Sequence, residues 1–331
     1  MADTTWATGD AATRKVWAKR WWIAAQEESY FYSHGYVGPE NENRHIIVEK
    51  GDLEKSPGDR ITMGQFSQLT GNGVTGDSQL EDNEEAMEDY TFTVTINQVR
   101  NGIRLLRMGS QRFAANKQLR TTAKTLLQTW MAEYIDENLF TALSDSPSKV
   151  VYAGDATSTA TLEATDLFTL GLVSKACTLA EKAVPLIRGV PMAGERMYVC
   201  VMANDQSYDL TENEARWEQA NRDAGPRTSK NRLWTGALGE WKNTIMHRHT
   251  NVPISTDWGA GADVYGATAL FMGVAAGGIA YAQKRSWVEE DFDYQNKQGY
   301  AVGSIFGSAK AVFNSNDNAV IAIQTAATNV A

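Results

Sequence analysis

The sequence has few cysteines, no long apolar run and no excess of positive charge. Cys177 and Cys200 are the only cysteines in 331 residues, too few and too far apart for a disulfide framework or a zinc site. No stretch has the length of a transmembrane helix, and the N-terminus lacks the apolar core of a signal peptide. We therefore expect two buried free thiols, no membrane association, and a protein that stays in the cell that makes it.

The composition narrows the range of partners. A net charge of -9 argues against nucleic-acid binding as the main source of affinity. The chain exceeds the size at which one hydrophobic core usually stops growing, so about two domains are expected. Hydrophobic residues make up only 43%, which fits a thin plate that buries apolar area against neighbours, although ordinary cytosolic enzymes have similar averages.

Three groups of residues resemble sites for chemistry, and each departs from the required pattern. Gly71, Gly73 and Gly76 have dinucleotide-motif spacing, but the next 13 residues, DSQLEDNEEAMED, carry seven carboxylates and no cation, which repels phosphate. These acids do not match a calcium loop either. His247 and His249 share one face of an expected strand without an evident third ligand. No serine, histidine and acid set is singled out by spacing, so we expect no catalysis, cofactor or metal. A nucleotide-dependent oxidoreductase is the alternative from another class of protein.

A strand, a long connector and a second strand occupy residues 61–97. Residues 90–97 alternate strictly between apolar and polar side chains, which predicts a strand with one apolar face and one solvent-exposed face. Residues 61–69 form a weaker partner strand. The 20-residue connector between them, 70–89, is too long for a tight hairpin turn. Because these two strands and their connector have little core of their own, we expect them to lie on another subunit.

The longest predicted helix covers residues 112–143, which contain neither proline nor glycine. Its length is about 45 Å at about 1.5 Å per residue. We expect one face to be apolar, formed by Leu119, Ala123, Leu126, Trp130 and Tyr134. Lys117, Arg120 and Lys124 lie on the opposite face. This basic stripe is either an intermolecular contact or a solvated face, and the sequence leaves both open.

An N-terminal helix is expected over residues 10–30. Trp17 and Trp21 share one face with Ala24, while Lys15 and Lys19 lie opposite. A basic amphipathic helix of this kind can bind a membrane surface. However, Trp22 falls on the lysine side, which favours an arm packed between protein surfaces. We therefore expect Trp17 and Trp21 to contact a neighbouring subunit.

The remainder of the chain mixes helices and strands. A helix is expected within residues 166–184, apolar at Leu170, Val173, Cys177 and Ala180 and ending before Pro185. Residues 197–202 form an apolar run of strand length. Two further strands are expected at 301–313 and 319–326, separated by the turn-rich sequence NSNDN. This order predicts an α+β fold.

Four segments of the sequence closely resemble a known family. They are DLEKSPGDRIT, Leu69 to Leu105, LWTGALGEWKNTIMHRHTNVP and AVFNSNDNAVIAI. They are similar to the major capsid proteins of tailed bacteriophages, in the branch related to the coat of phage N-four. The resemblance implies the Hong Kong 97-type coat fold. It implies an N-terminal arm (1–57), an extended β loop (58–106), a spine helix with peripheral domain (107–160), an axial domain (161–290) and return strands of the peripheral domain (291–331).

The resemblance also implies a function and partners. It indicates a virion protein that self-assembles, as pentamers and hexamers, into an icosahedral shell around double-stranded DNA in the cytoplasm of a bacterial host. The implied partners are a portal, packaged DNA bound without sequence specificity, and separate scaffolding or decoration proteins. Little chain precedes the extended loop, so a fused scaffolding segment is not expected. An encapsulin-like compartment shell is the alternative within the same fold.

Two expectations concern contacts between subunits. Some members of the resembled fold crosslink through a lysine on the extended loop, but no lysine lies between Leu69 and Leu105, so noncovalent assembly is expected. The second expectation joins charges of opposite sign. We expect acids of the loop tip, Glu81, Glu84 and Glu85, to meet the basic stripe of Lys117, Arg120 and Lys124 on a neighbour.

Overall fold

The computed structural model divides into two units, which are described separately. Unit 1 comprises Met1–Ile61, Val94–Ala142 and Ile279–Ala309, and unit 2 comprises Thr62–Thr93, Leu143–Gly278 and Lys310–Ala331. The structure describes residues 21–40, 44–52, 58–66, 71, 73–77, 79–86, 89–105, 119–192, 195–217, 238–294 and 296–330, with the backbone alone at 65 and 66.

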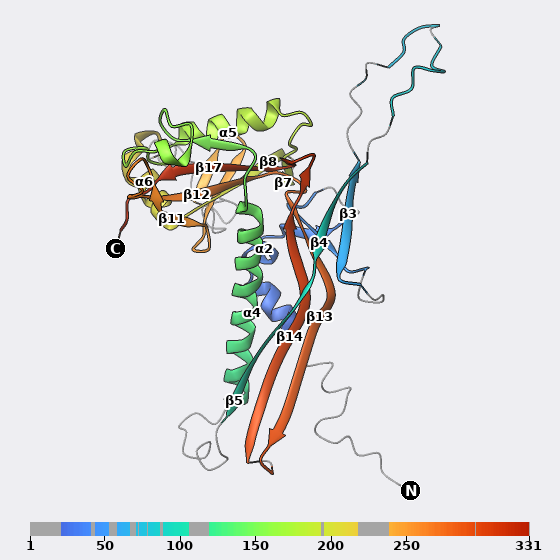
Figure 1. Ribbon diagram of the computed structural model, residues 1–331, viewed down its shortest axis with the longest axis vertical. Helices are drawn as coiled ribbons and strands as arrows, with labels where there is room; N and C mark the ends of the chain where they lie inside the picture. The colour runs from blue at the N-terminus through green and yellow to red at the C-terminus, as the bar shows by residue number, and fades with distance from the viewer. Residues whose placement is uncertain are drawn as a thin grey trace. The chain divides into compact units, whose positions relative to one another are not determined.

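Unit 1 is built on a five-stranded sheet with the order β1-β2-β13-β14-β5. Its strands are β1 (Val37–Pro39), β2 (Ile47–Lys50), β13 (Gly277–Phe292), β14 (Lys297–Lys310) and β5 (Asn97–Leu105). β14 and β5 are antiparallel over nine residue pairs, from Gln298↔Leu105 to Phe306↔Asn97. The long helix α4 (Leu119–Ser144) runs alongside β13 and β14 (Figure 1).

The predicted spine helix is present, but its buried face differs from the predicted one. α4 begins at Leu119 where the described residues resume, so the expected start at residue 112 lies outside them. The buried positions recur every three or four residues, namely Ala123, Leu127, Met131, Ile135, Leu139, Phe140 and Leu143. Leu126 is exposed, and Trp130 and Tyr134 are only half-buried. The helix is therefore rotated by about one residue from our expectation, because aromatic rings at 130 and 134 can cover the edge of the contact without entering it.

One glycine in unit 1 is required by a close backbone approach. A Cβ on Gly307 of β14 would lie 2.0 Å from the Thr95 carbonyl oxygen and 3.2 Å from the Cα of Ile96. The chain crosses β14 at this point on its way from the extended loop into β5. No side chain fits between the two backbones, so glycine lets β5 join the sheet.

Unit 2 contains an eight-stranded mixed sheet. Its order is β6-β17-β12-β8-β10-β9, with β11 paired to β12 and β7 paired to β8. The bounds are β6 (Val150–Tyr152), β7 (Val190–Met192), β8 (Glu195–Met202), β9 (Gly239–Trp241), β10 (Thr244–Arg248), β11 (Ile254–Trp258), β12 (Val264–Met272) and β17 (Val320–Ala326). Every residue of β17 is buried, which is typical of a central strand covered on both faces.

Two helices pack on this sheet. α5 (Leu170–Lys182) buries Leu170, Val173, Cys177 and Ala180, the four residues predicted from their helical spacing. α6 (Asn204–Asn213) is fixed by Gln206, whose side-chain amide donates hydrogen bonds to the Ala267 carbonyl and to the Thr325 hydroxyl. Figure 1 shows α5 above the strands of this unit. A short 3-10 helix, η2 (Thr159–Thr161), precedes α5.

The predicted pair of strands flanking the long connector is confirmed. β3 (Arg60–Phe66) and β4 (Asp89–Thr95) form a two-stranded sheet. A second short pair, β15 (Val312–Phe313) and β16 (Asn316–Asp317), contains the turn-rich NSNDN sequence. In this description the expected span 291–331 is shared between the units, since β14 lies in the five-stranded sheet and β17 in the eight-stranded one.

Candidate assembly surfaces

The described part of the N-terminal arm packs inside its own chain. Residues 21–28 are helical, and α2 (Tyr30–Ser33) follows. The Trp22 ring meets the Tyr281 ring edge-on at 5.6 Å, and the Phe31 and Phe140 rings are 5.0 Å apart. Trp21 has no exposed surface, which corrects the expectation that it contacts a neighbour. Trp17 lies outside the described residues.

A buried carboxylate of α4 holds the arm in place. Asp136 accepts hydrogen bonds from the Ser29 hydroxyl at 2.7 Å, from the Tyr30 amide at 2.7 Å and from the Phe31 amide at 3.5 Å. It therefore supplies the acceptor that the first amides of α2 lack within the helix. Burial raises the pKa of Asp136, and these hydrogen bonds oppose the increase. The role of Asp136 is therefore internal to the subunit.

A second cluster joins the arm to the sheet of unit 1. The Tyr32 hydroxyl donates to Glu49 at 2.9 Å, and the Tyr281 hydroxyl lies 2.8 Å from the Tyr32 oxygen. Lys284 forms an ion pair with the same Glu49 carboxylate. Burial raises the pKa of both tyrosines, so both remain protonated and able to donate. The arm is thus tied to β2 and β13 by polar contacts as well as by rings.

The basic stripe predicted on α4 is only partly available to a neighbour. Arg120 forms an ion pair with Glu289 at 2.6 Å, and the Trp287 indole donates to the same carboxylate oxygen at 2.7 Å. Lys124 is half-buried, and Lys117 lies outside the described residues. Arg120 still exposes 45% of its side chain, so it can contact a second acid. No local pattern pointed to Glu289, which follows α4 by more than 140 residues.

The acidic tip of the extended loop is exposed. Glu81, Glu84 and Glu85 are all exposed, and the Gly71 amide donates to a Glu85 oxygen at 2.6 Å. This hydrogen bond joins the outgoing and returning limbs of the loop. The structure therefore keeps these three acids on the surface of the loop.

The base of the loop is anchored by apolar and aromatic side chains of unit 2. The rings of Tyr90 and Phe92 lie 5.6 and 6.0 Å from the Phe313 ring. A Cβ on Gly278 would lie 2.3 Å from the Met63 sulfur, so the hairpin packs directly on the start of β13. The hairpin is held at its base, while its tip remains exposed.

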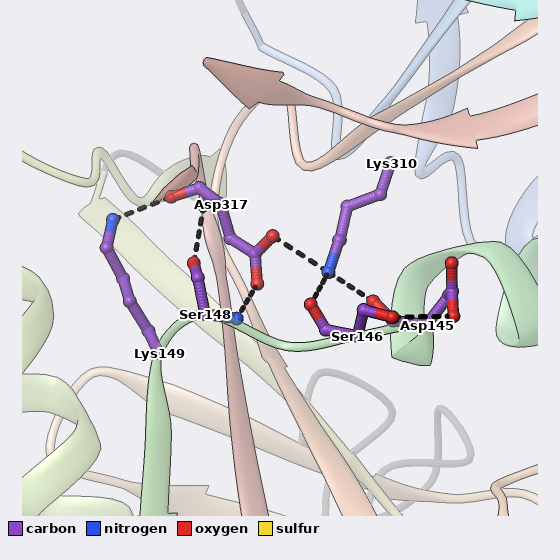
Figure 2. A network of polar contacts seen from close by, with 6 residues as sticks. All are labelled: Asp145, Ser146, Ser148, Lys149, Lys310 and Asp317. Atoms are coloured by element: carbon purple, nitrogen blue, oxygen red, sulfur yellow. Dashed lines mark hydrogen bonds and ion pairs between the residues drawn. The ribbon is translucent and has the colours of Figure 1, made fainter. Parts of the chain in front are cut away.

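A buried ion pair lies just after α4 (Figure 2). The Lys310 ammonium is 2.7 Å from Asp317 Oδ1, and their side chains are 6% and 2% exposed. Lys310 also donates to the Asp145 carbonyl at 2.5 Å and to the Ser146 carbonyl at 3.3 Å. The ammonium therefore has three acceptors, which offsets the cost of burying its charge.

Asp317, like Lys310, has a hydrogen-bonding or ionic partner for each of its polar groups. Its Oδ2 accepts the Ser148 amide at 2.9 Å, and its own amide donates to the Ser148 hydroxyl at 2.6 Å. Lys149 donates to the Asp317 carbonyl at 2.6 Å, and burial lowers the pKa of this lysine while Asp317 opposes the change. Figure 2 shows these side chains converging on the turn before β17. The cluster fixes the segment that leaves α4 to the strands that close unit 2.

The groups considered for chemistry do not assemble into a reactive site. Residues 79–86, which follow the glycine motif, form turns and loop without a helix, so no helix N-terminus is offered to a phosphate there. His247 is 3% exposed, and the described ranges contain no group of three metal-ligating side chains arranged around an ion. Burial raises the pKa of Cys177 to about 11 and of Cys200 to about 12, so both thiols are unreactive at neutral pH.

Sequence reasoning missed the buried charged residues of the described chain, which are Asp136, Asp209, Lys310 and Asp317. A signal existed only for Asp136, which interrupts a run of buried apolar positions from Met131 to Phe140. Lys310 and Asp317 are the last residues of β14 and β16, and charged side chains at strand ends are ordinarily solvated. Their pairing depends on tertiary contacts that no local pattern reveals.

The geometry defines a class of protein. A long helix beside a sheet of long strands, an anchored loop with an exposed tip and a separate α+β unit form the Hong Kong 97-type coat fold. The model of the family described as phage capsid protein matches residues 5–150 and 146–329. The chain belongs to this phage capsid protein family, as a major capsid protein of a tailed phage.

Individual relatives agree with this assignment. The chain is 26% identical to the major capsid protein of Pseudomonas phage KPP25, over 95% of each chain. It matches the capsid of Ralstonia phage GP4 with a TM-score of 0.81 and 30% identity, over 100% of both chains. The cyanophage Pam1 capsid matches with a TM-score of 0.74 and 21% identity, over 99% of this chain and 100% of that one. No helix in the described part of the chain has the length and apolar character of a bilayer span.

Proposed function

We propose that copies of this chain assemble as pentamers and hexamers into an icosahedral shell that encloses double-stranded DNA. The observation that carries this proposal is the full-length likeness to the GP4 capsid at 30% identity. Assembly takes place in the cytoplasm of a bacterial host, with a portal and, where needed, separate scaffolding or decoration proteins. The role is structural and involves no catalysis.

The charge of the chain supports loose packaging of the DNA. A net charge of -9 disfavours tight binding to phosphates, which supports holding of the DNA by enclosure and not by affinity. DNA inside the shell is therefore bound without sequence specificity.

We further propose that the loop tip of one subunit lies against α4 of a neighbour. Glu81, Glu84 and Glu85 are exposed, and the hairpin beneath them is anchored at Met63 and Phe92, so the tip projects a cation-free acidic surface. Its partners are Lys117, Arg120 and Lys124. Because Arg120 already has Glu289 beside it, the neighbour's acid would join an existing ion pair and form a three-charge network.

The loop carries no lysine between Leu69 and Leu105, which supports noncovalent assembly. Electron microscopy of the purified protein, expressed alone and with candidate scaffolding proteins, tests the shell directly. Closed icosahedral particles that dissociate to single chains in denaturing electrophoresis are expected. Soluble subunits that never associate would contradict the shell function, and a ladder resistant to denaturant would contradict noncovalent assembly.

A further inference from the structure

A run of exposed apolar residues projects from unit 2 between α5 and β7. Val184 is 88% exposed and Leu186 is 48% exposed, with exposed Pro185 between them. Leu179, in the last turn of α5, adds a further exposed apolar side chain. Consecutive exposed apolar residues cost solubility and ordinarily mark a contact with another molecule.

This segment is held in a defined position. The next residue, Ile187, is 2% exposed, and its amide donates to the Ala180 carbonyl at 3.3 Å. Three residues later, Val190 pairs with Met197 at the first part of β8. Residues 183–186 therefore form a fixed apolar projection, which we call the knob, at the end of unit 2 where β8 begins.

The other end of β8 carries a second exposed apolar surface. β8 ends at Met202, directly before α6, so its eight residues separate the two ends by about 25 Å. There Tyr208 of α6 and Ile254 of β11 are each nearly half exposed. The two elements meet at Ala267. This residue pairs with Ile254 of β11, and its carbonyl accepts a hydrogen bond from the side-chain amide of Gln206 in α6. We call this the α6–β11 end.

The charges around the two surfaces are complementary. Lys182 and Arg188 flank the knob, and Glu181 offsets one of these positive charges. The α6–β11 end has exposed Glu212 and Asp257 and half-buried Glu214, together with exposed Arg216 and Arg248. The balance is therefore positive at the knob and negative at the far end. Complementary charges of this kind favour one pairing of surfaces over pairing of like with like.

Ring symmetry explains why two different surfaces are needed. A ring of five or six identical chains is closed by heterologous contacts, in which one patch of each chain meets a different patch of the next. We propose that the knob of one copy docks on the α6–β11 end of the next copy within a pentamer or hexamer. This inference rests on the proposed shell function, and it names the contact that closes each ring.

Engineered cysteines test the contact directly. The pair Leu186→Cys and Ile254→Cys should form disulfides between copies in assembled particles, giving a non-reducing ladder that ends at five or six chains. The native thiols do not interfere, because Cys177 and Cys200 are buried. The matched control replaces Leu126, an exposed leucine of α4, in place of Ile254, and should give no ladder.

A second variant removes the apolar knob without touching the core. Val184→Ser with Leu186→Ser should leave the subunit folded, as judged by circular dichroism, and should reduce the yield of particles at least tenfold. Particles of the double-cysteine protein that show no ladder, together with normal assembly of the serine variant, would overturn the docking proposal and leave the shell function intact. Wild-type protein that forms no rings or shells would overturn both.

Discussion

The buried charges beyond α4 and the exposed charges of the loop tip differ in how fully each is bonded within the chain. Lys310 has three acceptors, and Asp317 forms three further hydrogen bonds, two with Ser148 and one with Lys149, all inside unit 2. The tip acids Glu81 and Glu84 are exposed on a loop without a cation. Buried charges with a full set of partners fix one conformation of a subunit. Exposed charges contribute little to the stability of the subunit and remain available to another chain.

Breaking the buried ion pair between Lys310 and Asp317 should reduce the stability of the subunit more than any other change. Lys310→Met leaves the Asp317 carboxylate buried without its cation, so we expect the free energy of unfolding of the subunit to fall by about 3–5 kcal/mol. Urea denaturation of unassembled protein measures this loss. Lys297→Met, which removes a partly exposed pair with Asp293, is the matched control and should cost at most about 1 kcal/mol.

The double variant Lys310→Met with Asp317→Asn sharpens this test. It removes the unpaired charge while the Asn oxygen still accepts the Ser148 amide, so part of the lost stability should return. Equal losses for Lys310→Met and Lys297→Met would show that burial does not distinguish the two pairs.

Removing Asp136 should have the second largest effect. Asp136→Ala leaves the Ser29 hydroxyl and the Tyr30 amide without their acceptor, at a cost of about 2 kcal/mol. Hydrogen exchange should show faster exchange in residues 21–34. Glu133→Ala, an exposed acid one turn earlier on α4, should change neither the stability nor the exchange rate measurably.

The same carboxylate gives a pH dependence of definite sign. Because the folded pKa of Asp136 is raised above its ordinary value of 3.8, the folded state binds the proton more tightly than the unfolded state. This contribution to the free energy of unfolding is complete below the ordinary pKa and is lost as pH rises through the folded value. The stability advantage of wild type over Asp136→Ala should therefore shrink as pH rises through that window. An advantage that grows over the same window would contradict the burial of this group.

Reversing the charges of the basic stripe on α4 should affect assembly far more than folding. Arg120→Glu with Lys124→Glu loses the ion pair with Glu289, whose contribution to subunit stability is about 0.2–1 kcal/mol. Particle yield should nevertheless fall sharply, because a shell repeats the contact at every subunit. Glu84→Lys with Glu85→Lys should partly restore the yield. Normal assembly of the reversed protein at low and high salt would show that the stripe is only solvated.

Neutralising the tip should have the smallest effect on the subunit. Glu81→Gln with Glu84→Gln should leave the free energy of unfolding, measured in urea, unchanged within about 0.5 kcal/mol, since both side chains are exposed. Light scattering should show that assembly becomes less sensitive to salt, because fewer screened charge pairs remain. Unchanged salt sensitivity would remove the tip from the contact.

Local patterns predicted the elements of this fold better than their orientations. Alternation located β4, and helical spacing located α5 with its buried face. The face of α4 was misjudged because Trp130 and Tyr134 carry large apolar rings at helical spacing, as Leu127 and Met131 carry apolar side chains, and only packing decides which of them enters the core. The partners of Arg120 and Lys310 could not be predicted, since each lies more than 150 residues from Glu289 or Asp145 along the chain and no local pattern links them.

The buried cluster also sets a rule for how relatives of this chain can vary. Two of the three acceptors of Lys310 are main-chain carbonyls, at Asp145 and Ser146, and any amino acid supplies a carbonyl. The contact with Lys310 therefore places no demand on the side chains at positions 145 and 146. Positions 310 and 317 depend on each other through charge, so in diverging lineages they should be replaced together or not at all.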